Sequence, residues 1–407
     1  MSVNVEIIYS KYKQNDVKIK ENIVHNIKQE VMKMFKTNKM GRKIVAGLTI
    51  TAMLASLAGC SGSTGSSGDT SDGSSDTSGG DLPILGASIY SSGDNFNTYL
   101  ASAIEKNAAN GYFECTVEDA QNDQATMNDQ VDAMIAKGAN AIALSLVDIS
   151  GAQTIIQKAQ NAGDIPVIFF NKEVTDTEVL ASYDNCYQVT STAGGYGADI
   201  QAEQIAEAFN DTSGDITIDK NGDGILQYVM LMGSSDHTAT IPRAEAIRTG
   251  LEAAGVEYEE LECDYGDWDT ATAKEKMDAW VSKYGDEIEF VVCANDAMAI
   301  GALQSVEAAG FNTEGLESEQ YIPIAGIDAL PDTLNYIDSG EIFCSVLQDS
   351  ATQGELIVKI AANLVDGKDP LDGIDGYEVE ENTKAIRVPY KAIDRSNTEE
   401  AAEGYQE

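Results

Sequence analysis

One polar segment has the ligand types and spacing of a calcium-binding loop. Oxygen-bearing side chains stand at its positions 1, 3, 5 and 9, as Asp219, Asn221, Asp223 and Gln227. Gly224 at position 6 allows the sharp turn, and Ile225 at position 7 offers its backbone carbonyl. Met230 occupies position 12, where a bidentate glutamate is usual. The segment is therefore either a polar turn or a structural calcium loop completed by a carboxylate from elsewhere in the chain, and we favour calcium.

Short polar side chains and aromatic residues recur where the expected strands end. The strand ends are Ser91–Phe96, Phe169–Glu173, Gly233–His237, Ala294–Asp296, Gly326–Asp328 and Leu347–Asp349. Ligands of parallel sheets bind beyond the carboxyl ends of the strands. Carboxylates and amides that hydrogen-bond in pairs, with an aromatic ring to cover C–H groups, suit a hydroxyl-rich neutral ligand. The alternative is that these Asp and Asn residues only cap the helices that follow.

The sequence contains no recognisable catalytic constellation. His237 is the last of two histidines, and it alone follows the N-terminal segment, which argues against a His-based triad or a multi-His metal centre. No GxSxG, P-loop or GxGxxG motif stands at a strand–helix junction. We therefore expect a binding protein and no enzyme.

These side chains are positioned by an alternation of short apolar runs and amphipathic stretches. Strands are expected at Ile84–Tyr90, Ala141–Val147, Ile165–Phe170, Leu226–Met232, Val256–Cys263, Ile288–Cys293, Ile322–Ile327 and Phe343–Leu347. Helices are expected at Asn97–Asn110, Gln124–Lys137, Gly151–Ala162, Ala244–Ala254, Thr270–Lys283 and Asp296–Ala309. This rhythm predicts an α/β fold with parallel sheets in βαβ units, and the length of the body suggests two domains.

The N-terminal part reads as an export signal that ends in a lipid-modified cysteine. A basic run that includes Lys33 and Arg42 precedes the apolar segment Ile44–Leu57, which is too short to span a bilayer. Small residues then lead to Cys60, the expected site of lipidation, so the expected location is the outer face of the cell membrane. Residues 1–59 form this signal with an upstream extension of doubtful status, because translation could start at Met32. Residues 60–81, nearly all Ser, Gly, Thr and Asp, form a tether.

The charge of the chain excludes nucleic acid as a partner. Residues 1–59 hold ten of the 26 Lys/Arg and four of the 67 Asp/Glu, so the remainder carries 16 basic and 63 acidic side chains, a formal charge of −47. Such a surface repels a polyanion. The five other cysteines are widely spaced with no CxxC pair, which indicates buried thiols and no thiolate metal site.

At the level of motifs, residues 84–395 resemble the bacterial galactose/glucose-binding proteins, the solute receptors of ABC sugar importers. The resemblance is carried by Asp94–Phe96, Gln121–Gln124, Leu146–Asp148, Phe169–Glu173, Trp268–Ala271, Lys276–Trp280, Asn295–Met298 and Arg387–Tyr390. It implies a type I periplasmic binding protein fold, with two Rossmann-like lobes and three hinge crossings near Thr190–Ser191, Gln348–Ser350 and Arg387–Lys391. Lobe 1 would comprise residues 82–190 and 350–388, and lobe 2 residues 191–349 and 389–407.

The resemblance also implies roles for individual residues. The positions matched to sugar-contacting residues are Asp94, Asn171, His237, Arg243, Asn295 and Asp328, with Phe96 and Trp268 as the aromatics on either side of the ring. Glu289 matches the distant carboxylate that completes the calcium site. The implied partners are a monosaccharide or galactoside and an ABC permease, with the protein acting as a monomer.

Two pocket positions depart from the family pattern. Ala239 stands where the family has an Asp that accepts from the anomeric hydroxyl, and Gln348 replaces an Asn at the hinge edge. Loss of a charge-assisted acceptor costs about 1.5–3 kcal/mol for a ligand that offers that hydroxyl. We therefore expect tolerance of a substituent at the anomeric carbon, or a shifted sugar preference.

Other functions remain open at this stage. The same receptor could present its ligand to a membrane sensor or chemoreceptor, or bind a different monosaccharide. A sugar-responsive transcription factor of this fold would need a helix-turn-helix and a basic N-terminal face, whereas here we expect a lipid anchor and a strongly acidic body. A tethered enzyme would need a nucleophile and a base.

Overall fold

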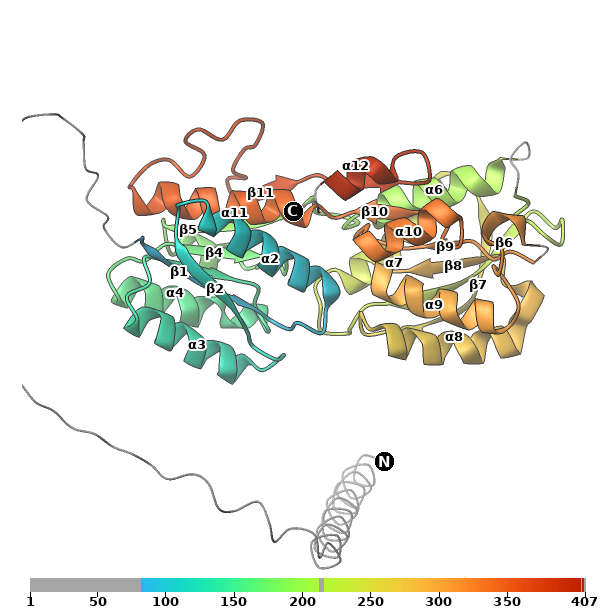
Figure 1. The fold of residues 1–407 in the computed structure, drawn as a ribbon, viewed down its shortest axis with the longest axis horizontal. Coiled ribbons are helices and arrows are strands. Elements are labelled where there is room, and N and C mark those ends of the chain that lie inside the picture. Colours follow the sequence, from blue (N-terminus) through green and yellow to red (C-terminus); the bar gives the residue numbers. More distant parts are fainter. Residues whose placement is uncertain (1–81, 212–215, 319, 404, 406–407) are drawn as a thin grey trace, which may run out of the picture. The chain divides into compact units, whose positions relative to one another are not determined.

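The computed structural model describes residues 82–211, 216–318, 320–403 and 405. The export signal, the tether and Cys60 lie outside the described residues. Within the described part, none of the helices is long and apolar enough to cross a membrane. The described residues belong to one compact unit, and Figure 1 shows that this unit consists of two lobes.

Lobe 1 is built on a sheet of six parallel strands in the order β11-β5-β4-β3-β1-β2. The strands are β1 (Ile84–Ile89), β2 (Glu114–Asp119), β3 (Ala141–Leu144), β4 (Val167–Phe170), β5 (Cys186–Ser191) and β11 (Ala385–Val388). The central strands β3 and β4 are apolar and buried along their whole length, because helices cover both faces of a parallel sheet.

Two groups of helices cover this sheet. On one face, α2 (Asn95–Ala109) and α11 (Ser350–Val365) pack against each other and share a core with β1. On the other face, α3 (Gln124–Ala136), α4 (Ala152–Asn161) and the short α5 (Thr177–Ala181) bury Met127, Ile155 and Leu180 in a second core. The turn η1 (Ile149–Gly151) leads into α4.

Lobe 2 contains a sheet of four parallel strands in the order β7-β6-β8-β9. The strands are β6 (Ile225–Met232), β7 (Glu257–Tyr265), β8 (Phe290–Cys293) and β9 (Ile324–Ala325). An antiparallel pair, β10 (Ser345–Leu347) and β12 (Lys391–Ile393), continues this sheet through single bridges from Ala325 to Cys344 and from Asp328 to Leu347.

Helices again cover both faces of the lobe 2 sheet. One face packs against α6 (Ala198–Asn210) and α7 (Thr240–Ala253), and the other against α8 (Thr270–Tyr284) and α9 (Asp296–Ala308). The remaining elements are α10 (Pro331–Ser339), α12 (Thr398–Glu403), η2 (Gly285–Glu287) and η3 (Gly315–Glu317). Each lobe therefore has its own pair of apolar cores.

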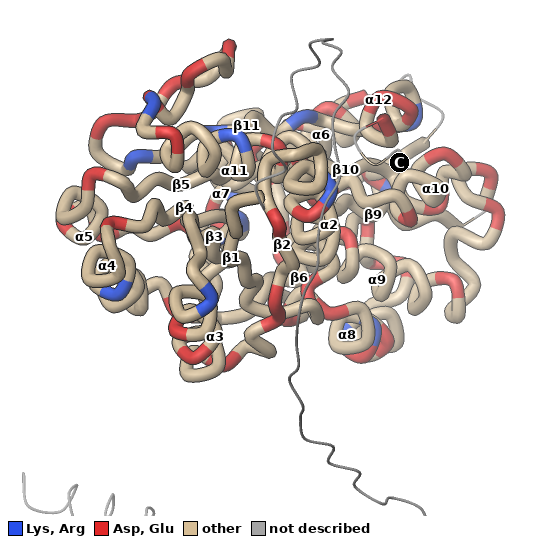
Figure 2. The backbone as a smooth tube through the Cα atoms, turned by 60° about the vertical axis from the view of Figure 1, so that its left-hand side comes forward, with Lys and Arg blue, Asp and Glu red and all other residues tan. Residues whose placement is uncertain are grey.

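The chain passes between the lobes three times. It leaves lobe 1 after β5, returns between β10 and α11, and leaves again between β11 and β12. Ser191, Gln348 and Pro389 lie at or next to these passages. Acidic residues lie over both lobes and greatly outnumber the basic ones (Figure 2).

The predicted α/β architecture of two parallel-sheet lobes is confirmed. The named helices agree with the observed ones to within a few residues, the largest difference being α7, which begins at Thr240 before the expected Ala244. The strand β2 escaped the search for apolar runs because its residues alternate and none is fully buried. Among the thiols, Cys186, Cys293 and Cys344 are buried, whereas Cys115 and Cys263 are only half-buried.

Candidate functional site

The nine residues predicted to bind ligand line one cavity between the lobes. These are Asp94, Phe96, Asn171, His237, Arg243, Trp268, Asn295, Asp328 and Gln348. Lobe 1 contributes the first three and lobe 2 most of the others. Thr190, Tyr196, Ala239 and Tyr390 complete the lining. The carboxyl ends of strands from both sheets therefore meet around a single space.

Asp94 is held in place by the first turn of α2. Its Oδ1 accepts a hydrogen bond from the backbone N–H of Phe96 at 3.0 Å, which makes Asp94 the N-cap of the helix. Its Oδ2 accepts from the hydroxyl of Tyr90, and the ammonium of Lys172 lies 4.0 Å from the centre of the Tyr90 ring. Burial raises the pKa of Asp94, although these hydrogen bonds lower it. Asp94 thus serves as a cap and as a cavity residue at once.

Asn171 follows β4 in a left-handed conformation, with φ of 62°. Its amide nitrogen donates to Oδ1 of Asn97 at 2.9 Å. A non-glycine residue in this region of conformational space is uncommon and clusters at functional sites. The strained turn directs the Asn171 side chain into the cavity.

Arg243 lies in the first turns of α7 and is almost fully buried. Its Nε donates to the carbonyl of Tyr196 at 3.0 Å, and Nη1 donates to the carbonyl of Ala294 at 2.6 Å. Its Nη2 donates to Oε1 of Gln348 at 3.0 Å and to the hydroxyl of Tyr390 at 3.3 Å. The guanidinium is therefore fixed by neutral acceptors from several segments.

His237 is neutral in this setting. Burial, with the positive charges of Lys172 and Arg243, holds its pKa well below the ordinary value. Its Nδ1 accepts from the backbone N–H of Ala239 at 3.1 Å, which leaves Nε2–H as the donor toward the cavity. The ring also stacks edge-on against Trp268, with centroids 5.0 Å apart.

Trp268 reaches the cavity because Gly233 at the end of β6 has no side chain. A Cβ atom on Gly233 would lie 1.8 Å from the indole ring, so no other residue fits there. Trp268 itself has a left-handed backbone, with φ of 61°, and its Nε1 donates to Oγ of Ser234 at 3.0 Å. Phe96 lines the cavity from lobe 1.

Asn295 and Asp328 come from neighbouring strands of lobe 2. Asn295 caps α9 through a 3.0 Å bond from the backbone N–H of Met298 to its Oδ1. Asp328 has φ of 124°, and its pKa is raised well above the ordinary value by burial and by the charge of Asp296 behind it. For Asp94 and Asn295 both sequence interpretations apply, since each caps a helix and also lines the cavity.

Sequence reasoning gave no role to Tyr90, Lys172, Tyr196 or Tyr390, although all of them except Tyr196 lie within two residues of a strand end. Tyr196 follows the first passage between the lobes, and Tyr390 lies on the third. Tyr90 and Lys172 were inside quoted or expected segments, but their contacts with Asp94 and with each other depend on the folded loops. The cavity as a whole offers carboxylates, amides, one guanidinium and two aromatic faces, which suits a ligand rich in hydroxyl groups.

The candidate calcium loop is folded around its own side chains. Asp219 accepts from the backbone N–H groups of Gly222 and Gly224 at 2.7 and 3.0 Å, and both glycines have positive φ. Asn221 and Gln227 lie in contact, with the Asn221 amide donating to Oε1 of Gln227 at 3.2 Å.

Glu289, the residue before β8, contacts this loop. Its buried carboxylate accepts from the backbone N–H of Lys220 at 2.7 Å and of Gln227 at 3.2 Å. Burial and the charge of Asp219 raise its pKa, and a divalent cation would offset both effects. No three carboxyl, thiol or imidazole groups of the described residues are close enough to hold a metal by themselves, so amide and backbone oxygens would have to complete the shell. The residues fit calcium by type and by loop conformation.

Two lobes that enclose a polar cavity beside the chain passages define a class of proteins that close around a solute. Residues 85–369 match the family model described as "Periplasmic binding protein domain". The chain belongs to this family.

Individual relatives agree with the assignment. The chain is 36% identical over 315 residues to a D-galactose/methyl-galactoside binding periplasmic protein of Haemophilus influenzae, covering 77% of this chain and 90% of that protein. It is 27% identical to a putative rhizopine-binding protein of Rhizobium meliloti, covering 78% and 91%. A solute-binding protein of an ABC transporter from Bacillus halodurans, solved with myo-inositol, superposes with a TM-score of 0.63 at 27% identity, covering 81% and 100%. All three are solute-binding proteins, and their family is not one of enzymes.

Proposed function

We propose that this protein captures galactose, glucose or a galactoside between its lobes and delivers it to an ABC importer. The observation that carries the proposal is the convergence of Asp94 and Asn171 from lobe 1 with Arg243, Asn295 and Asp328 from lobe 2 around one cavity. Such a ligand would contact both lobes only when they are closed, so binding would shift the population to the closed form.

The identity of the sugar depends on the end of the cavity near Ala239. Ala239 is buried beside His237 and carries no acceptor on its side chain, and Gln348 is turned toward Arg243. A substituent on the anomeric carbon would meet a methyl group at Ala239 instead of a carboxylate. This supports a galactoside as a ligand at least as good as the free sugar.

Two further features belong to the proposal. A structural calcium ion would be held by Asp219, Asn221, Asp223, Gln227 and Glu289 with the carbonyl of Ile225. A lipid on Cys60 would keep the protein at the outer face of the membrane, where the permease receives the sugar. Replacing Cys60 with Ala should release the protein from the membrane fraction and abolish fatty-acid labelling; a labelled or membrane-bound variant would contradict the anchor.

Calorimetric titration tests the ligand. Galactose, glucose, methyl β-galactoside and myo-inositol are added separately to the purified protein in calcium, and one-to-one binding of a galactose-type sugar is expected. Tighter binding of the glycoside than of galactose would support the role given to Ala239. Binding of myo-inositol alone would keep the transport function and overturn the sugar assignment.

A further inference from the structure

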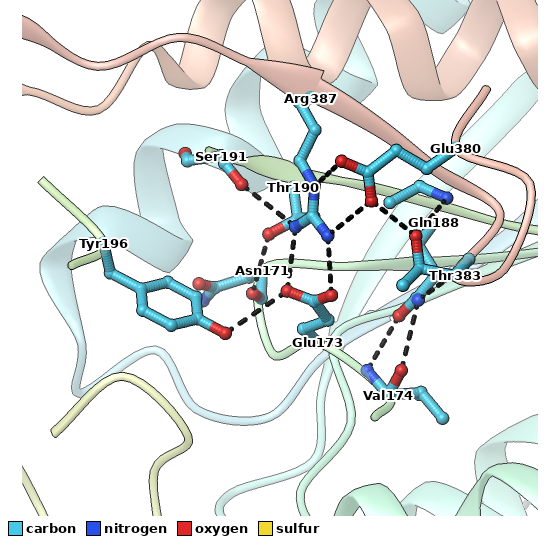
Figure 3. A network of polar contacts seen from close by, with 11 residues as sticks. Asn171, Glu173, Val174, Gln188, Thr190, Ser191, Tyr196, Glu380, Thr383 and Arg387 are labelled. Carbon is cyan, nitrogen blue, oxygen red and sulfur yellow. Dashed lines mark hydrogen bonds and ion pairs between the residues drawn. The ribbon is translucent and has the colours of Figure 1, made fainter. Parts of the chain in front are cut away.

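A cluster of ion-paired side chains, centred on Arg387, lies where β11 approaches the loop after β4 (Figure 3). Arg387 holds Glu173 in bidentate fashion, with Nη1–Oε2 and Nη2–Oε1 distances of 2.8 and 2.7 Å. Its Nε and Nη2 also donate to Glu380 at 3.1 and 2.9 Å, and Nη1 donates to the carbonyl of Ser191 at 3.3 Å. Both partners are well buried, since the side chains of Arg387 and Glu173 are 14% and 6% exposed. This geometry fixes the Glu173 carboxylate in lobe 1.

One hydrogen bond to this carboxylate comes from the other lobe. The hydroxyl of Tyr196 donates to Oε2 of Glu173 at 3.2 Å (Figure 3). Tyr196 follows the first passage and its backbone belongs to lobe 2, because its carbonyl accepts from Nε of Arg243 on α7. The neighbouring Gly195 packs so tightly on α7 that a Cβ there would lie 2.9 Å from Cβ of Ala246. The Tyr196–Glu173 bond therefore joins the two lobes.

The same two residues also orient the cavity. Glu173 lies in the loop that begins with Asn171, whose carbonyl accepts from Oγ1 of Thr190 at 3.4 Å. Tyr196 holds Arg243 through its carbonyl and lines the cavity with its ring. A residue of lobe 2 that fixes Arg243 is thus bonded, through its hydroxyl, to the loop of lobe 1 that presents Asn171.

The bond suits a contact that forms and breaks with lobe movement. The Glu173 carboxylate is already ordered by Arg387, so accepting one more donor costs little side-chain entropy. Burial and the charge of Glu173 raise the pKa of Tyr196, which keeps the phenol protonated as a donor over the physiological range. When the lobes separate, the hydroxyl can bond to water, while Glu173 keeps its Arg387 partner.

We propose that the Tyr196–Glu173 hydrogen bond is an interlobe latch that stabilises the closed form and slows release of the bound solute, with Arg387 as the residue that positions Glu173. The expected effect on the rate of solute release rests on the proposed sugar-binding function. The expected effect on closure of the lobes does not depend on which ligand binds.

The test compares Tyr196→Phe with Tyr258→Phe in the purified full-length protein. Tyr258 donates to Oε1 of Glu252 at the same distance, 3.2 Å, but both residues belong to lobe 2, so Y258F controls for loss of a phenol–carboxylate bond that does not join the lobes. Galactose release is followed by stopped-flow tryptophan fluorescence, in which Trp268 lines the cavity and Trp280 gives a background signal. Release about tenfold faster in Y196F, with Y258F like the wild type, is expected for a bond to a charged group.

A double-mutant cycle separates the latch from a direct contact of the hydroxyl with the sugar. With Glu173→Ala present, which removes the side-chain acceptor, Y196F should accelerate release much less than it does alone. An equal effect in both backgrounds would show that the hydroxyl acts on the ligand itself, and would overturn the proposal, as would unchanged release in Y196F.

Small-angle X-ray scattering of the ligand-free proteins tests whether the bond stabilises the closed form. The ligand-free Y196F protein should have a larger radius of gyration than the wild type and Y258F, because the closed form loses a contact. Equal radii would overturn the latch. If the wild type binds none of the sugars, the sugar assignment fails, while this comparison still decides whether the bond holds the lobes together.

Discussion

Oε1 of Gln348 accepts a hydrogen bond from Nη2 of Arg243 at 3.0 Å, at the second passage between the lobes. The hydroxyl of Tyr390, on the third passage, lies within 3.2 Å of the same oxygen. The amide therefore anchors the buried guanidinium to two segments that connect the lobes. The cavity and the hinge share these atoms.

Replacing Gln348 with Ala should weaken galactose binding by about tenfold or more, because one N–H of a buried guanidinium loses its acceptor. Calorimetry measures the loss. Gln157→Ala, an exposed position on α4, serves as the control and should bind like the wild type. Equal affinities in both variants would show that Gln348 does not orient Arg243.

Replacing Ala239 with Asp should shift the preference toward free galactose over methyl β-galactoside by about tenfold, because the new carboxylate accepts from a free anomeric hydroxyl. Ala239 also stands at the N-terminus of α7, where a negative charge is favourable for the helix. Ala239→Ser, which adds a polar group without a charge, is the matched control. An unchanged ratio of affinities in A239D would contradict the location assigned to the anomeric carbon.

Calcium should raise the melting temperature of the wild type by several degrees, since an ion that binds only the folded state stabilises it. Glu289→Gln should remove most of this gain, whereas the exposed Glu287→Gln, two residues away, should keep it. Scanning calorimetry with calcium and with a chelator measures both. An unchanged melting temperature of the wild type on addition of calcium would refute the metal site.

The stability of the protein should depend on pH through Asp296. Burial raises the pKa of this carboxyl to about 7, although bonds from Ser345 and the backbone of Leu330 lower it. An unfolded Asp titrates near pH 3.9, so the folded state binds more protons in between, and stability falls as pH rises from about 4 to about 7.

Replacing Asp296 with Asn removes that dependence. The variant loses hydrogen bonds at every pH, so its free energy of unfolding is lower than that of the wild type. This difference in free energy should become smaller between pH 4.5 and pH 7.5. Urea unfolding at the two pH values gives the difference. Titrating groups remote from Asp296 cancel in the comparison, whereas Asp328 adds to the change in the same direction, because Asp296 helps to raise its pKa. A deficit that widens with pH would contradict the raised pKa.

Much of the site was predictable because parallel sheets place strand ends together. Asn295 and Asp328 follow an apolar run directly, and Asp94 follows one after three residues. The fold rule places all three at the carboxyl ends of the strands of the two sheets. Arg243 was reached only through the resemblance, because it stands inside a helix with no local signal. The hydrogen bonds of Arg243 to Gln348 and Tyr390 depend on where the separate passages between the lobes lie. That placement is a property of the tertiary structure.

Other residues gave no signal at all. Tyr196 lies among Gly194, Gly195 and Gly197, where the sequence indicates a loop without indicating which way its aromatic ring points. The sequence gives Gly233 no role beyond its place at the end of a strand. The structure shows that the indole of Trp268 fills the space that a side chain at position 233 would occupy. Steric relations between distant segments cannot be derived from spacing.

The apolar cores of the two lobes share no residue. With only three connecting segments, each lobe can in principle unfold on its own, and calorimetry of the ligand-free protein would then record two overlapping heat absorption peaks. A solute held by residues of both lobes dissociates when either one unfolds, so it links the two transitions. The concentration of solute around the protein would thus set the cooperativity of unfolding, and with it the resistance of the protein to extracytoplasmic proteases.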